Sequence, residues 1–82
     1  MSILDFLSGN IFMRRDGSSA KLAVIVNSVA EEYSFIKRKH PGFRPEIQYL
    51  CQLEGKAYDV IDISNAAGEK RTLYFDVSGF YG

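Results

Sequence analysis

Three consecutive segments in the second half of the chain alternate apolar and polar side chains. They cover residues 46–54, residues 57–63 and the stretch from residue 70 to the end. An alternation with a period of two places the apolar side chains on one face of a β-strand. Gly55-Lys56 separates the first two segments and suits a type II′ turn, which needs glycine first. Short strands joined in this way predict an antiparallel meander.

One long helix is expected before this meander, at residues 19–39. Its apolar residues follow a 3.6-residue period, and they are Leu22, Ile25, Val26, Val29, Tyr33 and Ile36. The β-branched residues 24–26 would also suit a strand, but Glu31 and Glu32 in the same period favour the helix. The basic residues 37–40 suit the negative end of the helix dipole.

These elements predict an α+β fold, with the long helix packed on a three- or four-stranded antiparallel meander sheet. A chain of 82 residues is expected to form a single small domain with a thin core, residues 1–82. The apolar side chains near the start of the chain predict a short helix within residues 1–9. Residues 10–15 are a candidate fourth strand.

The expected turns set a strand register that leaves apolar side chains on both faces of the sheet. In that register Cys51 lies opposite Val60, and Val60 lies opposite Leu73. The face under the helix then holds Ile47, Tyr49, Cys51, Leu53, Tyr58, Val60, Leu73, Phe75 and Val77. The other face holds Leu50, Ile61, Ile63 and Tyr74. A register shift of one residue would exchange the faces of a strand, so this assignment depends on the turns.

An apolar patch on the second face is a candidate interface. The sequence favours a homodimer joined through this face or through the free edge of the sheet. The expected interface residues are Leu50, Ile61, Ile63 and Tyr74, with Phe80 and Tyr81 extending the contact. The alternative is that Ile3, Leu4, Phe6 and Leu7 fold over the patch within one chain.

The charges balance, with ten basic and ten acidic residues, and this argues against a dedicated nucleic-acid-binding protein. The basic residues are nevertheless concentrated before residue 45. An alternative function is therefore phosphate or nucleic-acid binding by the basic helix end, residues 37–44, and neighbouring cations. The candidate contacts are Arg14, Arg15, Lys37, Arg38, Lys39 and Arg44.

No combination of residues predicts an active site or a metal site. His40, the only histidine, is expected to act as a cation at the helix end, and Cys51 as a small buried hydrophobic residue. The acids Asp59, Asp62 and Asp76 lie on two strands, and Asp62 is expected to form a cross-strand pair with Arg71. The sequence therefore predicts a protein that is not an enzyme and binds no metal or cofactor.

One cysteine permits no internal disulfide, and the longest apolar runs are too short to span a bilayer. We expect a cytoplasmic protein without a membrane partner. Its expected function is that of a small interaction module which binds a second copy or another protein. A small-ligand binder with its site between subunits is a further alternative.

Overall fold

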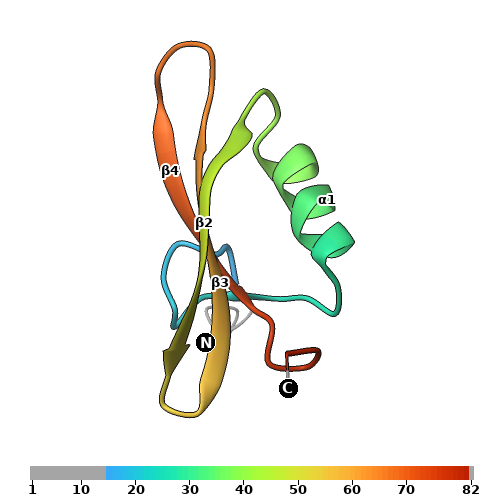
Figure 1. Cartoon of the computed structure of the whole chain (residues 1–82). Helices are drawn as coiled ribbons and strands as arrows, with labels where there is room; N and C mark the ends of the chain where they lie inside the picture. Colours follow the sequence, from blue (N-terminus) through green and yellow to red (C-terminus); the bar gives the residue numbers. More distant parts are fainter. Residues whose placement is uncertain (1–14, 82) are drawn as a thin grey trace, which may run out of the picture.

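The computed structural model describes residues 15–81, and these form a four-stranded sheet with one helix on one face (Figure 1). The elements in chain order are β1 (Val24–Ile25), α1 (Val29–Lys39), β2 (Arg44–Leu53), β3 (Lys56–Ser64) and β4 (Lys70–Asp76). Their order across the sheet is β1-β4-β3-β2. The three long strands are antiparallel as expected, but β1 runs parallel to β4, so the sheet is mixed. The α+β class is confirmed, whereas the purely antiparallel sheet is wrong.

The helix has 11 residues and is half as long as expected, because it begins at Val29. Ser28 is its N-cap, and the Ser28 hydroxyl accepts a hydrogen bond from the Glu31 N–H at 3.2 Å. Glu31 in turn accepts a bond from the Asn27 N–H at 2.7 Å. The first contact satisfies a backbone donor that the first turn leaves free, and the second satisfies the N–H of the residue before the N-cap. The β-branched residues before them form β1, so the strand preference of that run prevailed.

The turn between β2 and β3 consists of Glu54 and Gly55, because Leu53 pairs with Lys56. Both turn residues have positive φ, 50° for Glu54 and 80° for Gly55, as a type I′ turn requires. The expected turn at Gly55-Lys56 is therefore wrong by one position. Moving the turn by one position shifts the pairing of β2 and β3 by two residues, so Cys51 lies opposite Tyr58. A shift of two residues keeps the same side chains of the two strands on a common face, as expected.

The register of β3 and β4 differs from the expected one by a single residue. Ile61 lies opposite Leu73, and Val60 lies opposite Tyr74. In the loop between these strands, the Asn65 side chain accepts hydrogen bonds from the N–H groups of Ala67 and Glu69. This shift exchanges the faces of β3 relative to β4.

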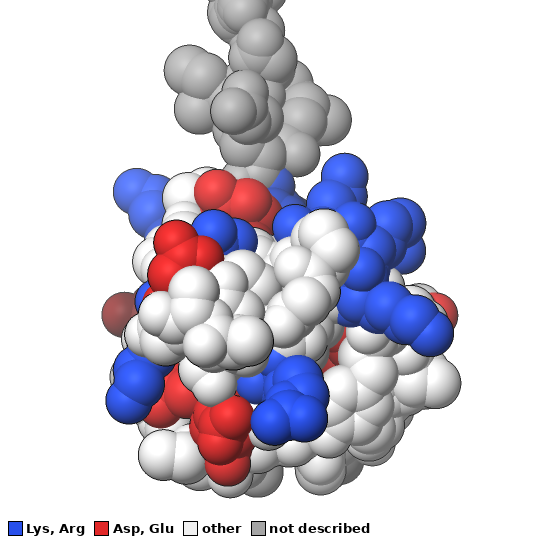
Figure 2. All heavy atoms as spheres, turned by 90° about the horizontal axis from the view of Figure 1, so that it is seen from above, with Lys and Arg blue, Asp and Glu red and all other residues white. Residues whose placement is uncertain are grey.

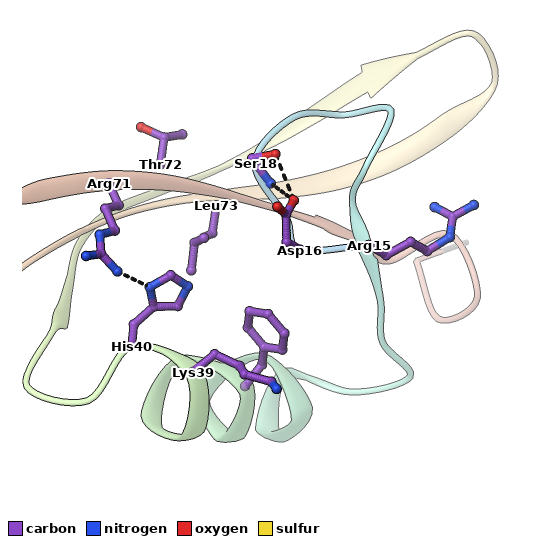
Figure 3. Close-up of a pocket in the computed structure, with 9 residues that line it drawn as sticks. Arg15, Asp16, Ser18, Lys39, His40, Arg71, Thr72 and Leu73 are labelled. Atoms are coloured by element: carbon purple, nitrogen blue, oxygen red, sulfur yellow. Dashed lines mark hydrogen bonds between the residues drawn. The ribbon is translucent and has the colours of Figure 1, made fainter. Parts of the chain in front are cut away.

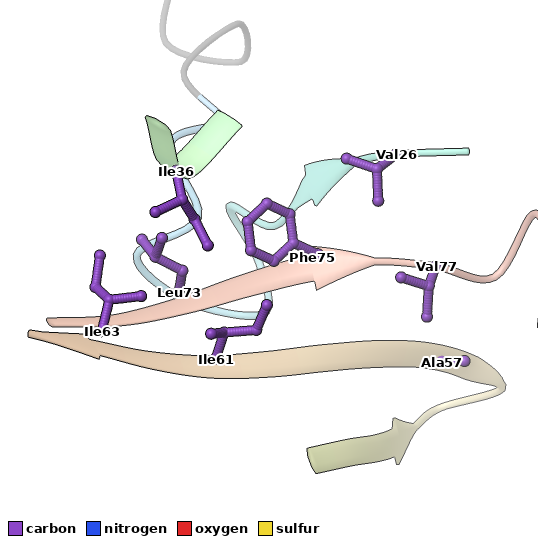
Figure 4. Packing of buried hydrophobic residues seen from close by; sticks show 8 residues of the cluster. All are labelled: Val26, Ile36, Ala57, Ile61, Ile63, Leu73, Phe75 and Val77. Carbon is purple, nitrogen blue, oxygen red and sulfur yellow. The ribbon is translucent and has the colours of Figure 1, made fainter. Parts of the chain in front are cut away.

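The core under α1 consequently contains residues that were expected on the other face. Ile61 and Ile63 are 0% and 1% exposed, and they point toward α1 together with Leu73 and Phe75 (Figure 4). Phe35 of α1 meets Phe75 edge-on, with 5.7 Å between the ring centroids. A helix residue and two central strands thus share one continuous apolar core.

The face opposite α1 is covered in part by residues 20–23. Ala20 and Ala23 pack there in one cluster with Tyr58 and Val60. Gly17 makes this close approach possible, because a side chain at this position would come within 3.3 Å of the Tyr74 carbonyl oxygen. The alternative cover by Ile3, Leu4, Phe6 and Leu7, the helix in residues 1–9 and nearly all of the candidate strand 10–15 lie outside the described residues.

Candidate functional site

The expected interface residues do not form one surface. Ile61 and Ile63 are buried beneath α1, so they are unable to contact a second copy of the folded chain. Leu50 is exposed on the edge strand β2, while Tyr74 is half-buried in the cluster on the opposite face. Phe80 and Tyr81 are exposed beyond the end of β4. The expected surface is lost because the one-residue shift between β3 and β4 turns Ile61 and Ile63 toward α1.

The exposed apolar side chains of the sheet are concentrated on β2 instead. Ile47, Tyr49, Leu50 and Leu53 are between 46% and 59% exposed. Ile47, Tyr49 and Leu53 lie on the face opposite α1, and Leu50 lies on the α1 side, since strand side chains alternate. No charged residue occurs from Ile47 to Leu53. β2 is thus a long edge strand with apolar side chains on both faces.

A second candidate site is a cleft of about 550 Å³ between α1, the loop after Arg15 and β4 (Figure 3). Its lining residues are Arg15, Asp16, Ser18, Phe35, Lys39, His40, Arg71, Thr72 and Leu73. Lys39 and His40 come from the C-terminal end of α1, and Arg71 faces them from β4. Asp16 and Ser18 lie on the loop beside them.

Arg71 is held in place by two contacts. Its Nη1 donates a hydrogen bond to His40 Nδ1 at 2.8 Å. Its guanidinium carbon lies 4.3 Å from the centroid of the Phe43 ring, a cation–π contact. The expected pair of Arg71 with Asp62 is not formed, because Thr72 takes that place and donates to Asp62 Oδ1 at 2.7 Å. The register shift thus directs Arg71 toward α1.

His40 has a pKa below its ordinary value of 6.5. Partial burial is the main cause, the charge of Arg71 adds to it, and Asp16 opposes it. His40 is therefore neutral at neutral pH. Its Nδ1 accepts a hydrogen bond, so the ring hydrogen is on Nε2. The lowered pKa argues against the expected role of His40 as a helix-end cation at this pH.

The expected basic contacts are only partly brought together. Arg15 and Lys39 line the cleft, although the Arg15 guanidinium donates to the Ala23 carbonyl and points away from His40 (Figure 3). Arg38 lies over the Phe35 ring, and Arg44 begins β2. Lys37 belongs to the last turn of α1, and Arg14 lies outside the described residues. Lys and Arg side chains gather on the side of the molecule where α1 lies (Figure 2).

His40 and Cys51 lie on opposite faces of the sheet. Cys51 is half-buried in the cluster with Tyr58 and Val60, whereas His40 contacts Arg71 on the α1 side. They are therefore not a nucleophile and its base. Within residues 15–81, no group of three His, Cys, Asp or Glu side chains is arranged to hold a metal ion.

A polar network connects α1 to β2 and β3. The Tyr33 hydroxyl donates to Gln48 Oε1 at 2.8 Å, and Gln48 Nε2 donates to Asp59 Oδ2 at 2.7 Å. Glu32 lies next to this network and is 0% exposed. Burial, together with the nearby charge of Asp59, raises the pKa of Glu32 to about 8. Glu32 is thus a neutral acid at neutral pH.

Glu32 would attract attention as a catalytic acid, because such groups often have raised pKa values. It is completely enclosed, however, and it does not line the cleft beside His40. Neither of its carboxyl oxygens makes a hydrogen bond of ordinary geometry with another described residue. In the described structure Glu32 is therefore buried, with no access for a substrate.

No known protein family, no curated protein and no solved structure matches this chain. In the part of the chain that the structure describes, no helix has both the length and the apolar character needed to cross a membrane.

Proposed function

We propose that this chain is a non-enzymatic interaction module which forms a homodimer by pairing β2 with β2 of a second copy. The observation that carries the proposal is the exposure of apolar side chains on both faces of an edge strand. An edge strand has a row of backbone donors and acceptors without strand partners along one side. Natural proteins commonly protect such an edge with charges, and β2 has none between Ile47 and Leu53.

Charge complementarity favours one register for this pairing. Two antiparallel β2 strands related by a twofold axis perpendicular to the sheet keep both α1 helices on the same side. With the axis at Tyr49, Arg44 of one copy comes near Glu54 of the partner subunit. With the axis at Leu50, Glu46 would instead come near Glu54 of the partner subunit, and like charges would repel. We therefore place Tyr49 at the centre of the interface.

The expected affinity is moderate. A stable interface usually buries about 800 Å² of each partner, and one pair of edge strands buries less. The dimer should therefore dissociate in the micromolar range, at a Kd of roughly 1–100 µM. The single cysteine supports a cytoplasmic location as part of the same proposal, since no internal disulfide stabilises the fold.

Replacement of Tyr49 by Lys should convert the dimer to a monomer. Two lysines would face each other at the axis, and the dissociation constant should rise by at least about tenfold. Light scattering coupled to gel filtration measures the mass against the 9.2 kDa of one chain. The matched control is Ile25→Lys, because Ile25 is 59% exposed on the opposite edge strand, β1. A native chain that remains monomeric at hundreds of micromolar would refute the proposal, and cover of β2 within one chain would then be the better account.

Exchange of the two terminal charges tests the register separately from the dimer itself. Arg44→Glu and Glu54→Lys should each weaken the dimer, because each places like charges at both ends of the paired strands. The double variant should recover most of the native affinity, since it restores opposite charges. Recovery is measured in the same light-scattering series. If the dimer affinity were unchanged in all three variants, the proposed register would be refuted, while the homodimer itself would stand.

A further inference from the structure

The cleft beside the C-terminal end of α1 has features of a ligand site that the homodimer does not use. We propose that it binds a small organic anion, with the phosphate or carboxylate group against Lys39 and His40 and the apolar body against Phe35 and Leu73. The volume of about 550 Å³ is within the usual range for small-molecule sites. The β2 edge is a separate surface, so this inference is independent of the dimer.

Arg71 is a cation in a fixed position, and among the described residues no acid lies within ion-pair distance of it. Phe43 and His40 hold its guanidinium through the two contacts described above. Among residues 15–81 the ion pair found is between Lys56 and Asp76, so neither Arg71 nor Lys39 has an acid within ion-pair distance there. Arg71 therefore fixes the His40 ring in place, while Lys39 supplies the cation for an oxyanion.

His40 adds a hydrogen-bond donor to this group. Because Arg71 donates to Nδ1, the neutral ring has its hydrogen on Nε2. In Figure 3 the other ring nitrogen is directed away from Arg71, into the space between the end of α1 and the loop of Asp16. An anion in this space would meet the Nε2 donor of His40 and the charge of Lys39.

Asp16 limits the kind of ligand that fits. Its Oδ1 accepts hydrogen bonds from the Ser18 N–H at 3.0 Å and from the Ser18 hydroxyl at 2.7 Å, so the carboxylate is fixed at the cleft. A second anionic group on the ligand would be repelled there. The site therefore suits a molecule with one anionic end and an apolar or aromatic body. A nucleic-acid strand, with a charge at every phosphate, fits it less well.

The only histidine of the chain provides a direct readout. Its ring proton resonances are a single pair in the NMR spectrum, and they are observed at a pH of about 8, where His40 is neutral. Phenyl phosphate and benzoate should each shift these resonances in a saturable way at millimolar concentration. Comparison of the two identifies the preferred anionic group. Benzyl alcohol, which lacks the charge, should leave them unchanged, and inorganic phosphate should bind more weakly because it lacks the apolar body.

Two neighbouring lysines make a matched pair for this experiment. Both Lys37 and Lys39 are exposed on the last turn of α1, but only Lys39 lines the cleft. Lys39→Gln should weaken phenyl phosphate binding by roughly tenfold, the effect of losing one charge-assisted contact, while Lys37→Gln should not change it. Equal weakening by both variants would show diffuse attraction to the helix end and overturn the site. Absence of any saturable shift with both anions would overturn it as well.

Discussion

Raising the pH from about 5 to about 9 should destabilise the folded chain by several kcal/mol, and Glu32 is the cause. Its pKa is about 8 in the folded protein, against 4.5 for an ordinary glutamate in the unfolded chain. The folded state therefore holds a proton that the unfolded state releases. This contribution to stability is complete below about pH 4.5 and is lost as the pH rises through about 8. At about 1.4 kcal/mol for each pH unit, the full loss is on the order of 5 kcal/mol.

Glu32→Gln should remove most of this dependence. The amide is neutral at every pH, has nearly the same shape and is able to donate a hydrogen bond toward Asp59. Denaturant unfolding followed by circular dichroism, at one protein concentration, should give equal stabilities for the two chains near pH 5 and a more stable variant near pH 9. Glu54→Gln, at an exposed turn, should keep the same loss of stability between pH 5 and pH 9 as the native chain. Parallel curves for the native and Glu32→Gln chains would contradict this explanation.

Asp76 and His40 lower the stability of the fold toward acid pH, which is the opposite direction, so they do not affect the measurement of the alkaline loss. Burial alone would raise the pKa of Asp76, but hydrogen bonds from Ser78 and the charges of Lys56 and Arg15 lower it overall. Its contribution to stability is lost as the pH falls. The lowered pKa of His40 likewise disfavours folding at acid pH, because the unfolded chain takes up a proton more readily. The alkaline loss is therefore the part that Glu32→Gln tests.

Ile61→Lys should abolish folding. Ile61 is 0% exposed in the core under α1, between strands on both sides. A lysine here would lose the packing of the isoleucine and bury an ammonium group in an apolar site, at a cost above about 4–5 kcal/mol. A small domain has a stability of about the same size, so the folded population should be lost. Circular dichroism and the dispersion of NMR resonances measure the outcome.

Ile47→Lys is the matched control, because it makes the same change on the neighbouring strand. Ile47 is 59% exposed, so the folded chain should lose less than about 1 kcal/mol. It should, however, weaken the homodimer, since Ile47 belongs to the proposed interface. If Ile61→Lys remained folded and monomeric, Ile61 would be an exposed interface residue and the register described for β3 and β4 would be wrong.

The strand pattern and the end of the helix were readable from the sequence because both depend on local chemistry. Alternation over residues 46–54 and 57–63 corresponds to β2 and β3 within a few residues. The basic last turn and the glycine that follows mark the end of α1 at Lys39. The start of α1 was missed by ten residues. The apolar positions of residues 22–26 continue the helical period by coincidence, but the strand preference of the β-branched residues and the pairing of Val24 and Ile25 with β4 make β1 a strand.

The register was not readable, and the candidate sites depend on it. Asn65 and Gly68 shape the loop that pairs Ser64 with Lys70, and no rule of strand alternation distinguishes this pairing from one displaced by a single residue. That displacement decides that Ile61 is in the core and that Arg71 faces His40. His40 and Arg71 are both visible in the sequence. They are separated by 31 positions along the chain, so no local pattern predicts their contact.

The sequence by itself determined the α+β class, the three long strands, the end of the helix and the basic charge of its last turn. Each of these follows from propensity, periodicity or charge over a few neighbouring residues. The tertiary structure decided which face of each strand is buried, where α1 begins and which cations meet in the cleft. Those outcomes depend on the pairing of distant segments. A shift of one residue there changes no local preference, but it turns every side chain of a strand to the other face.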